Sequence, residues 1–168
     1  MSNNFEVKTK KALFLNGERI TEYNWDKIEW FANTEIIIAT NEEREFALYS
    51  KKDGELMYEV DNYISHEIKD DYIIIKIMHI DLPLYGVISF NGKVIVPVAF
   101  TAINETEYKN VFYIEMSKLV KGYYLSNNGQ IVTGATEVTK PNDVEYDFLI
   151  DGEWKRYSFI DGVYTVIN

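Results

Sequence analysis

The sequence predicts an all-β protein made of four to five degenerate copies of one hairpin-plus-strand unit. Tyrosine, phenylalanine, isoleucine and valine are frequent, and such side chains fit the pleated, half-buried surface of a sheet. No long stretch places apolar residues at helical spacing. Asn-Gly or Asp-Gly dipeptides also recur between short apolar runs at a nearly constant interval. Their glycines are Gly17, Gly54, Gly92 and Gly129, which are 37, 38 and 37 residues apart.

Each of these glycines is predicted to lie in the turn of a β-hairpin. Before Gly92, for example, stands the apolar run 87–88, and after it the run 94–96. Asn-Gly and Asp-Gly suit a type I′ turn because both central residues of that turn have positive φ. The spacing therefore predicts four hairpins, one for each copy of the unit.

A third apolar run follows each glycine by about 18 to 20 residues. These runs are nearly continuous rather than alternating, which predicts strands buried on both faces. They occupy residues 36–38, 72–75, 111–114 and 146–149. The segment between each hairpin and its third strand is expected to be an irregular connector.

The predicted organisation is a single domain over residues 1–168. Its units cover residues 11–45, 46–84, 85–120 and 121–150, and a meander over 146–168 caps the C-terminal edge. We expect three-stranded meanders in an open, twisted or stacked array. A small closed propeller-like or barrel arrangement is the alternative. An uncovered edge strand would allow a homodimer.

The third unit resembles the WG repeat, a bacterial β-hairpin repeat. The resemblance rests on residues 85–103, with Tyr85-Gly86 at the opening pair, Asn91-Gly92 at the turn, a strand ending in Pro97, and Phe100 beyond it. No unit has tryptophan at the signature position. The resemblance implies β-repeat architecture and an interaction module, and it transfers no functional residue.

Charge and composition limit the classes of partner. The net charge of −10 disfavours direct binding of nucleic acid and favours a protein partner with a basic surface. The absence of cysteine excludes disulfides and thiolate metal sites. Residues 1–11 are polar, and no apolar run approaches the length of a membrane-spanning helix. We therefore expect a cytoplasmic protein that does not enter a membrane.

No motif assembles a catalytic, cofactor or metal site. Neighbouring residues on a strand point in opposite directions, so Ser65, His66 and Glu67 do not form a triad with one another. His79 and Asp81 share a face, but no third metal ligand stands near them in the sequence. Phosphate-binding glycine motifs are absent. The expected protein is not an enzyme and holds no cofactor.

The predicted function is a non-catalytic protein-interaction module. Its acidic surface suggests an inhibitor of a basic protein, such as a toxin immunity protein or a phage-encoded antagonist of a bacterial defence protein. The alternative is a β-repeat protein that binds a glycan or another small ligand. Aromatic anchors with a charged rim are typical of binding hot spots. The candidate partner-binding residues are Trp30, Phe31, Glu42, Glu43, Glu45, Asp70 and Asp71.

Overall fold

A computed structural model describes residues 5–8, 12–21, 25–31, 34–158 and 163–166. Over these residues the chain forms nineteen strands and no helix, which confirms the predicted all-β class. None of the described segments is a helix long and apolar enough to cross a membrane. By its internal contacts the chain divides into two compact units, Met1–Val98 (unit 1) and Ala99–Asn168 (unit 2). The prediction of a single domain stays a prediction.

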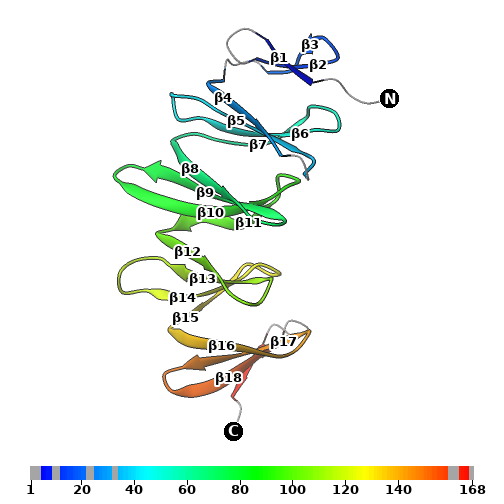
Figure 1. Cartoon of the computed structure of the whole chain (residues 1–168). Helices are drawn as coiled ribbons and strands as arrows, with labels where there is room; N and C mark the ends of the chain where they lie inside the picture. Colours follow the sequence, from blue (N-terminus) through cyan, green and yellow to red (C-terminus); the bar gives the residue numbers. More distant parts are fainter. Residues whose placement is uncertain (1–4, 9–11, 22–24, 32–33, 159–162, 167–168) are drawn as a thin grey trace. The chain divides into compact units, whose positions relative to one another are not determined.

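Unit 1 contains three antiparallel sheets, whose strands carry labels in Figure 1. The first has three strands: β1 (Phe5–Lys8), β2 (Ala12–Leu15) and β3 (Glu18–Arg19). The second has four: β4 (Lys27–Trp30), β5 (Ile36–Thr40), β6 (Phe46–Ser50) and β7 (Leu56–Val60). The third also has four: β8 (Tyr63–Ile68), β9 (Tyr72–His79), β10 (Leu82–Ser89) and β11 (Val94–Phe100), the last of which ends in unit 2.

Unit 2 contains two four-stranded antiparallel sheets. One is formed by β12 (Ala102–Glu105), β13 (Val111–Glu115), β14 (Lys121–Leu125) and β15 (Gln130–Thr133). The other is formed by β16 (Ala135–Asn142), β17 (Glu145–Ile150), β18 (Glu153–Ser158) and β19 (Val163–Val166). β17, β18 and β19 form the predicted C-terminal meander, although residues 159–162 lie outside the described part of the chain.

Strand pairing groups the predicted segments differently from the sequence units. Each third strand pairs with the hairpin that follows it, as β5 does with β6. The prediction of an irregular connector is wrong. The connector supplies the outer strand of that sheet, as β4 does beside β5. A short outer strand such as β4 lacks the apolar run that predicts a buried strand, because it pairs with one strand only and none of its residues is fully buried. In all five described sheets the strand order is linear, so none closes into a barrel.

The predicted hairpins are present, but their turns are of two kinds. Both residues have positive φ at Asn16-Gly17 (51° and 90°) and at Asp151-Gly152 (55° and 81°), as a type I′ turn requires. At Gly54, Gly92 and Gly129 only the glycine has positive φ, and the connection is longer. The dipeptide therefore marks the chain reversal without fixing the turn type.

The two inner strands of the four-stranded sheets carry most of the core. All five residues of β5 are buried, as predicted for a strand covered on both faces. Ile36 and Ile38 face a cluster shared with β9 and β10, whereas Ile37 and Ala39 face a cluster shared with Leu13. Alternation along one strand thus joins successive sheets of unit 1. We call the cluster around Ile36, Ile38, Ile73, Ile75 and Ile88 the aliphatic seam.

The two sheets of unit 2 meet in a cluster that is rich in tyrosine. Tyr123, Tyr146 and Tyr157 are buried in it around Phe148, and Tyr108 and Tyr113 pack against it. Its aromatic rings contact one another edge-on or stacked, with centroids such as those of Tyr146 and Phe148 6.4 Å apart. We call this cluster the tyrosine seam.

Candidate functional site: two acidic hollows with aromatic walls

A hollow of about 510 Å³ opens beside the tyrosine seam of unit 2. Three tyrosines and three glutamates line it, together with short polar side chains and one valine. The lining residues are Tyr108, Tyr113, Tyr123, Glu105, Glu107, Glu137, Asn104, Thr106, Thr136 and Val138. We call it the tyrosine hollow. These residues come from β12, β13, β14, β16 and the loop between β12 and β13.

Strand register and one threonine position the aromatic wall. Tyr113 and Tyr123 are paired across β13 and β14, and their rings lie 5.5 Å apart at 72°. The Thr106 hydroxyl donates a hydrogen bond to the Val111 carbonyl (2.7 Å) and accepts one from the Tyr108 backbone N–H (3.1 Å). These bonds close the loop before β13 and hold Tyr108 at the hollow.

The lining of the hollow is acidic, and the pKa values of two of its tyrosines are raised. A hydrogen bond from the Tyr108 hydroxyl to the Glu107 carboxylate raises the pKa of Tyr108. Burial raises the pKa of Tyr123, and the nearby Tyr113 and Glu137 add to that effect. No lysine or arginine is among the described lining residues. The hollow therefore offers aromatic rings and acidic side chains to whatever enters it.

This combination favours a cationic guest. The face of a tyrosine ring carries negative electrostatic potential and attracts an ammonium or guanidinium group within about 6 Å. Carboxylates at the rim add a Coulombic attraction that salt weakens. Phenol rings also stack on sugar rings, and the side chains of Asn104 and Thr136 provide hydrogen-bonding groups.

Unit 1 has a second acidic hollow, of about 570 Å³, lined by Trp25, Glu45, Phe46, Glu59, Val60 and Asp61. We call it the tryptophan hollow. Trp25 is 3% exposed and packs edge-on against Tyr49, with ring centroids 6.4 Å apart. Glu45 is held by Asn41, whose side-chain amide donates to the carboxylate (2.5 Å) and accepts from the Glu45 backbone N–H (2.9 Å).

The structure places the predicted acidic partner-binding residues at opposite ends of strand β8. Glu42, Glu43 and Glu45 lie in the turn between β5 and β6, and of these only Glu45 lines the tryptophan hollow. β8 starts beside this turn, since the Tyr63 N–H donates to the Arg44 carbonyl (2.7 Å). Asp70 and Asp71 follow the far end of β8, about six residues at 3.3 Å each away. The two acidic groups therefore do not form one surface.

The two predicted aromatic residues, Trp30 and Phe31, differ in exposure. Trp30, at the end of β4, is 39% exposed. Phe31 packs against the aliphatic seam, and its carbonyl accepts a hydrogen bond from the Lys51 ammonium (2.5 Å). Phe31 thus serves the fold of unit 1 with its side chain and its backbone, whereas the Trp30 indole is the more accessible of the two.

His66 lies in a largely buried polar network that the sequence did not indicate. Its Nδ1 is 2.7 Å from the Tyr63 hydroxyl, and its Nε2 is 3.8 Å from Glu29 Oε2. Burial lowers the pKa of His66, and the nearby Glu29 carboxylate only partly offsets this. The partners come from β8 and β4 rather than from adjacent residues. Across the described residues, no group of three or more His, Cys, Asp or Glu side chains could hold a metal ion.

The tyrosine hollow was missed by reasoning from sequence. Glu105 and Glu107 stand out only as one of many carboxylate pairs, and Tyr113 only as part of an apolar run. The usable signal is that Tyr113 and Tyr123 stand on successive predicted strands, where pairing brings them together. The third wall, Tyr108, comes from a loop and has no such signal.

No family model and no curated protein matches the chain. Several solved structures are similar to it at low identity. The computationally designed Ika4 protein is 14% identical, with a TM-score of 0.37, over 83% of this chain and 88% of its own. BamB from Moraxella catarrhalis is 10% identical, with a TM-score of 0.36, over 94% and 56%. Hsv2 from Kluyveromyces lactis is 12% identical, with a TM-score of 0.39, over 97% and 59%. This chain thus spans little more than half of BamB and Hsv2, and such likenesses say nothing about function.

Proposed function

We propose that the chain is a non-catalytic protein-interaction module that binds a basic segment of a protein partner. In this proposal the tyrosine hollow accepts a lysine or arginine side chain. One observation carries it: three tyrosines and three glutamates converge on a single hollow whose described lining includes no basic side chain. A hollow of this composition attracts a cation from two sources, the ring faces and the carboxylates.

The charge of the whole chain supports the same class of partner. With a net charge of −10, the chain attracts basic surfaces over a distance set by the ionic strength. The tryptophan hollow of unit 1 adds three carboxylates above the buried Trp25 and Phe46. Each unit therefore offers its own acidic site, and a partner with two basic segments would gain from both.

An inhibitor is the specific role that we propose for such a module. A chain that covers a basic groove excludes the natural ligand of that groove, as an immunity protein does for a toxin. A phage-encoded antagonist of a defence protein would act in the same way. The acidic charge and the absence of a recognised catalytic motif support this role.

The second candidate is a glycan-binding module, which one observation favours. Asn104, Thr106 and Thr136 line the tyrosine hollow beside the phenol rings. Stacking on an aromatic ring together with amide and hydroxyl hydrogen bonds is the chemistry that recognises a sugar.

Titration with a fluorescent oligoarginine peptide tests the proposal. Glu137→Gln, at the hollow, should weaken binding at least fivefold because it removes one of three carboxylates near the guest. Glu153→Gln makes the same charge change at an exposed residue at the start of β18 in the same unit, outside the lining of the hollow, and serves as the matched control. Tyr113→Leu should weaken binding at low and high salt alike, since it removes a ring face.

Equal effects of Glu137→Gln and Glu153→Gln would refute the hollow as the site and leave only a general effect of charge. A glycan array run on the same proteins separates the second candidate. Sugar binding that Tyr113→Leu abolishes, without peptide binding, would replace the basic partner with a glycan.

A further inference from the structure

The hairpin of β9 and β10 has an exposed apolar tip. Eight residues of each strand pair in register from Tyr72 with Ser89 to His79 with Leu82, whereas β5 and β6 pair over five. The two-residue turn between them is Ile80-Asp81. Ile80 is 83% exposed and Leu82 is 51% exposed. We call Ile80 and Leu82 the hairpin tip.

The backbone at Ile80 is strained as well as exposed. Its φ is 55°, in the left-handed region that a side chain branched at Cβ adopts least readily. Four other described non-glycine residues have positive φ, and all are unbranched at Cβ: Asn16, Arg44, Asn62 and Asp151. Asparagine or glycine would suit a two-residue hairpin turn better. Isoleucine here thus opposes folding through its backbone and gains nothing from burial.

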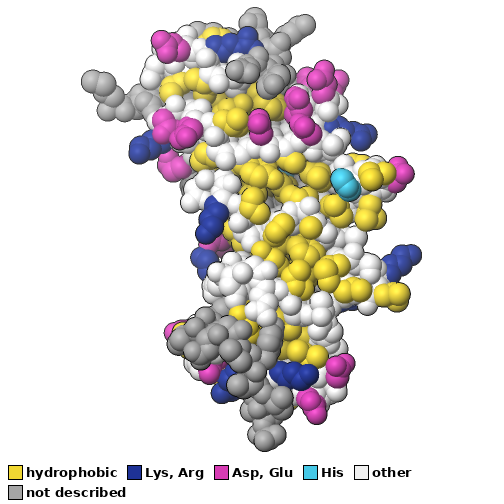
Figure 2. Space-filling model, turned by 180° about the vertical axis from the view of Figure 1, so that it is seen from behind, with side chains coloured by type: hydrophobic (Ala, Val, Ile, Leu, Met, Phe, Trp, Pro, Cys, Tyr) yellow, Lys and Arg dark blue, Asp and Glu magenta, His cyan; other side chains and the backbone are white. Residues whose placement is uncertain are grey.

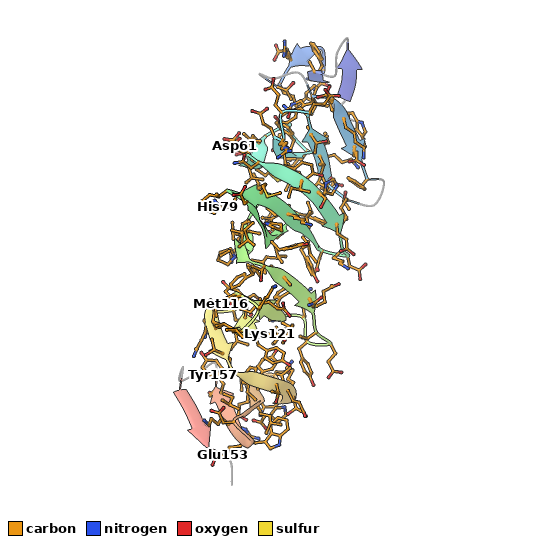
Figure 3. The ribbon with its side chains drawn as sticks, turned by 90° about the vertical axis from the view of Figure 1, so that its left-hand side faces the viewer. Asp61, His79, Met116, Lys121, Glu153 and Tyr157 are labelled. Atoms are coloured by element: carbon orange, nitrogen blue, oxygen red, sulfur yellow. The ribbon has the colours of Figure 1, made fainter. Side chains whose placement is uncertain are left out.

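Two exposed carboxylates stand beside the hairpin tip, Asp81 in its turn and Asp61 in the neighbouring turn. The Met78 N–H donates to the Asn62 carbonyl (2.7 Å), which holds the hairpin beside the turn that contains Asp61. Asp61 and Asp81 are both exposed, and Asp61 also lines the tryptophan hollow. Figure 3 shows Asp61 and His79 along the same edge of unit 1. In Figure 2, hydrophobic side chains gather on the surface at the height of β8 to β11.

We propose that the hairpin tip inserts into an apolar pocket of a protein partner whose rim carries lysine or arginine. The apolar pair supplies the area to be buried, and Asp61 and Asp81 supply charges complementary to the rim. The inference adds a second surface to the proposed function and rests on its class of partner. Its residues lie in unit 1, whereas the tyrosine hollow lies in unit 2, so variants separate the two.

The charges beside the tip also argue against other occupants. A second copy of the chain, docked tip to tip, would bring Asp81 of each copy together. An anionic lipid surface would meet the same repulsion. A basic rim around an apolar pocket satisfies both features of the tip.

Selection from a displayed random-peptide library, followed by affinity measurements with the selected synthetic peptides, tests this inference. The variants are Ile80→Asn, which suits positive φ, and Val144→Asn as the matched control. Val144 is a branched residue that is 41% exposed in unit 2. Thermal unfolding and sedimentation are measured on the same full-length proteins.

We expect selected peptides that combine apolar residues with lysine or arginine. They should bind wild type and Val144→Asn equally and Ile80→Asn at least tenfold more weakly, while Ile80→Asn unfolds at the same or a higher temperature. Equal binding to Ile80→Asn, or failure to select any such peptide, would overturn the proposal. If Ile80→Asn unfolds at a lower temperature than wild type, Ile80 contributes to the stability of the fold, and the proposal is overturned. If wild type sediments as a dimer and Ile80→Asn as a monomer, the tip binds a second copy of the chain, and the proposal is overturned.

Discussion

Units 1 and 2 use the same four-stranded meander but join their sheets with different side chains. In unit 1 the aliphatic seam contains isoleucine and leucine, such as Ile73, Ile75 and Leu48, each 0% exposed. In unit 2 the tyrosine seam places hydroxyl groups in the same structural position. Branched aliphatic side chains fill the space between sheets, whereas tyrosine rings extend to the rim and wall a hollow. The same meander thus packs its sheets through aliphatic side chains in one unit and leaves an aromatic-walled hollow beside the joint in the other.

The turn glycines differ in how closely a neighbouring sheet packs against them. In unit 1 a Cβ on Gly92 would lie 2.3 Å from the Met57 carbonyl oxygen, and one on Gly54 would lie 2.6 Å from Ile20 Cδ1. Met57 and Ile20 each stand three residues after the preceding turn glycine, so this contact repeats from sheet to sheet. Gly17 in unit 1 and Gly152 in unit 2, by contrast, have open space around the Cβ position.

The largest effect is expected from Gly92→Ala compared with Gly152→Ala. Both glycines have positive φ (79° and 81°), so alanine should cost about 1–2 kcal/mol of folding free energy at either site. At Gly92 the added methyl group also meets backbone atoms of Met57, and such overpacking costs about 1–3 kcal/mol more. Urea unfolding of the two variants measures the difference.

Equal destabilisation by the two substitutions would show that the packing of the Gly92 turn against β7 contributes nothing. The difference between the two units would then rest on the composition of the two clusters alone.

The next effect concerns the hydroxyl groups of the tyrosine seam. Tyr157 is fully buried on β18, and its hydroxyl accepts a hydrogen bond from the Asn128 side-chain amide. Tyr157→Phe should therefore lower the free energy of unfolding by about 1 kcal/mol. Tyr58→Phe, at a ring that packs against the aliphatic seam, is the matched control and should change stability by less than half of that. Urea unfolding measures both variants. If Tyr58→Phe lowers the free energy of unfolding more than Tyr157→Phe does, hydroxyl groups do not contribute more to the tyrosine seam than to the aliphatic seam.

Much of the fold follows from local sequence signals. Turn glycines and continuous apolar runs predict the hairpins and the buried strands, as at Gly92 and β5, because both depend on neighbouring residues. The outer strands β4, β8, β12 and β16 were missed as strands, since their exposed residues carry no apolar pattern. Which hairpin a third strand joins is decided by pairing across the chain, and spacing alone does not encode it.

The candidate site was less accessible to sequence reasoning. Charge predicts a basic partner, but the acidic residues predicted to bind it lie at the two ends of β8, and of them only Glu45 lines a hollow. Tyr108, Tyr113 and Tyr123 converge from a loop and two strands, so their proximity is a tertiary property. Ile80 breaks the local rule for hairpin turns, and such a violation is visible only when φ is known.

The smallest effect is expected from pH and again separates the units, because both histidines lie in unit 1. Burial lowers the pKa of His66 in the folded state below its ordinary value of about 6.5. Below that pH the unfolded chain binds more protons than the folded chain, so stability decreases as the pH falls through this window. His66→Gln should reduce this decrease, as followed by urea unfolding between about pH 7 and pH 5. His79→Gln changes an exposed histidine and should retain it. If His66→Gln and wild type lose stability in parallel, the protonation of this network contributes nothing, and carboxylates elsewhere account for the loss.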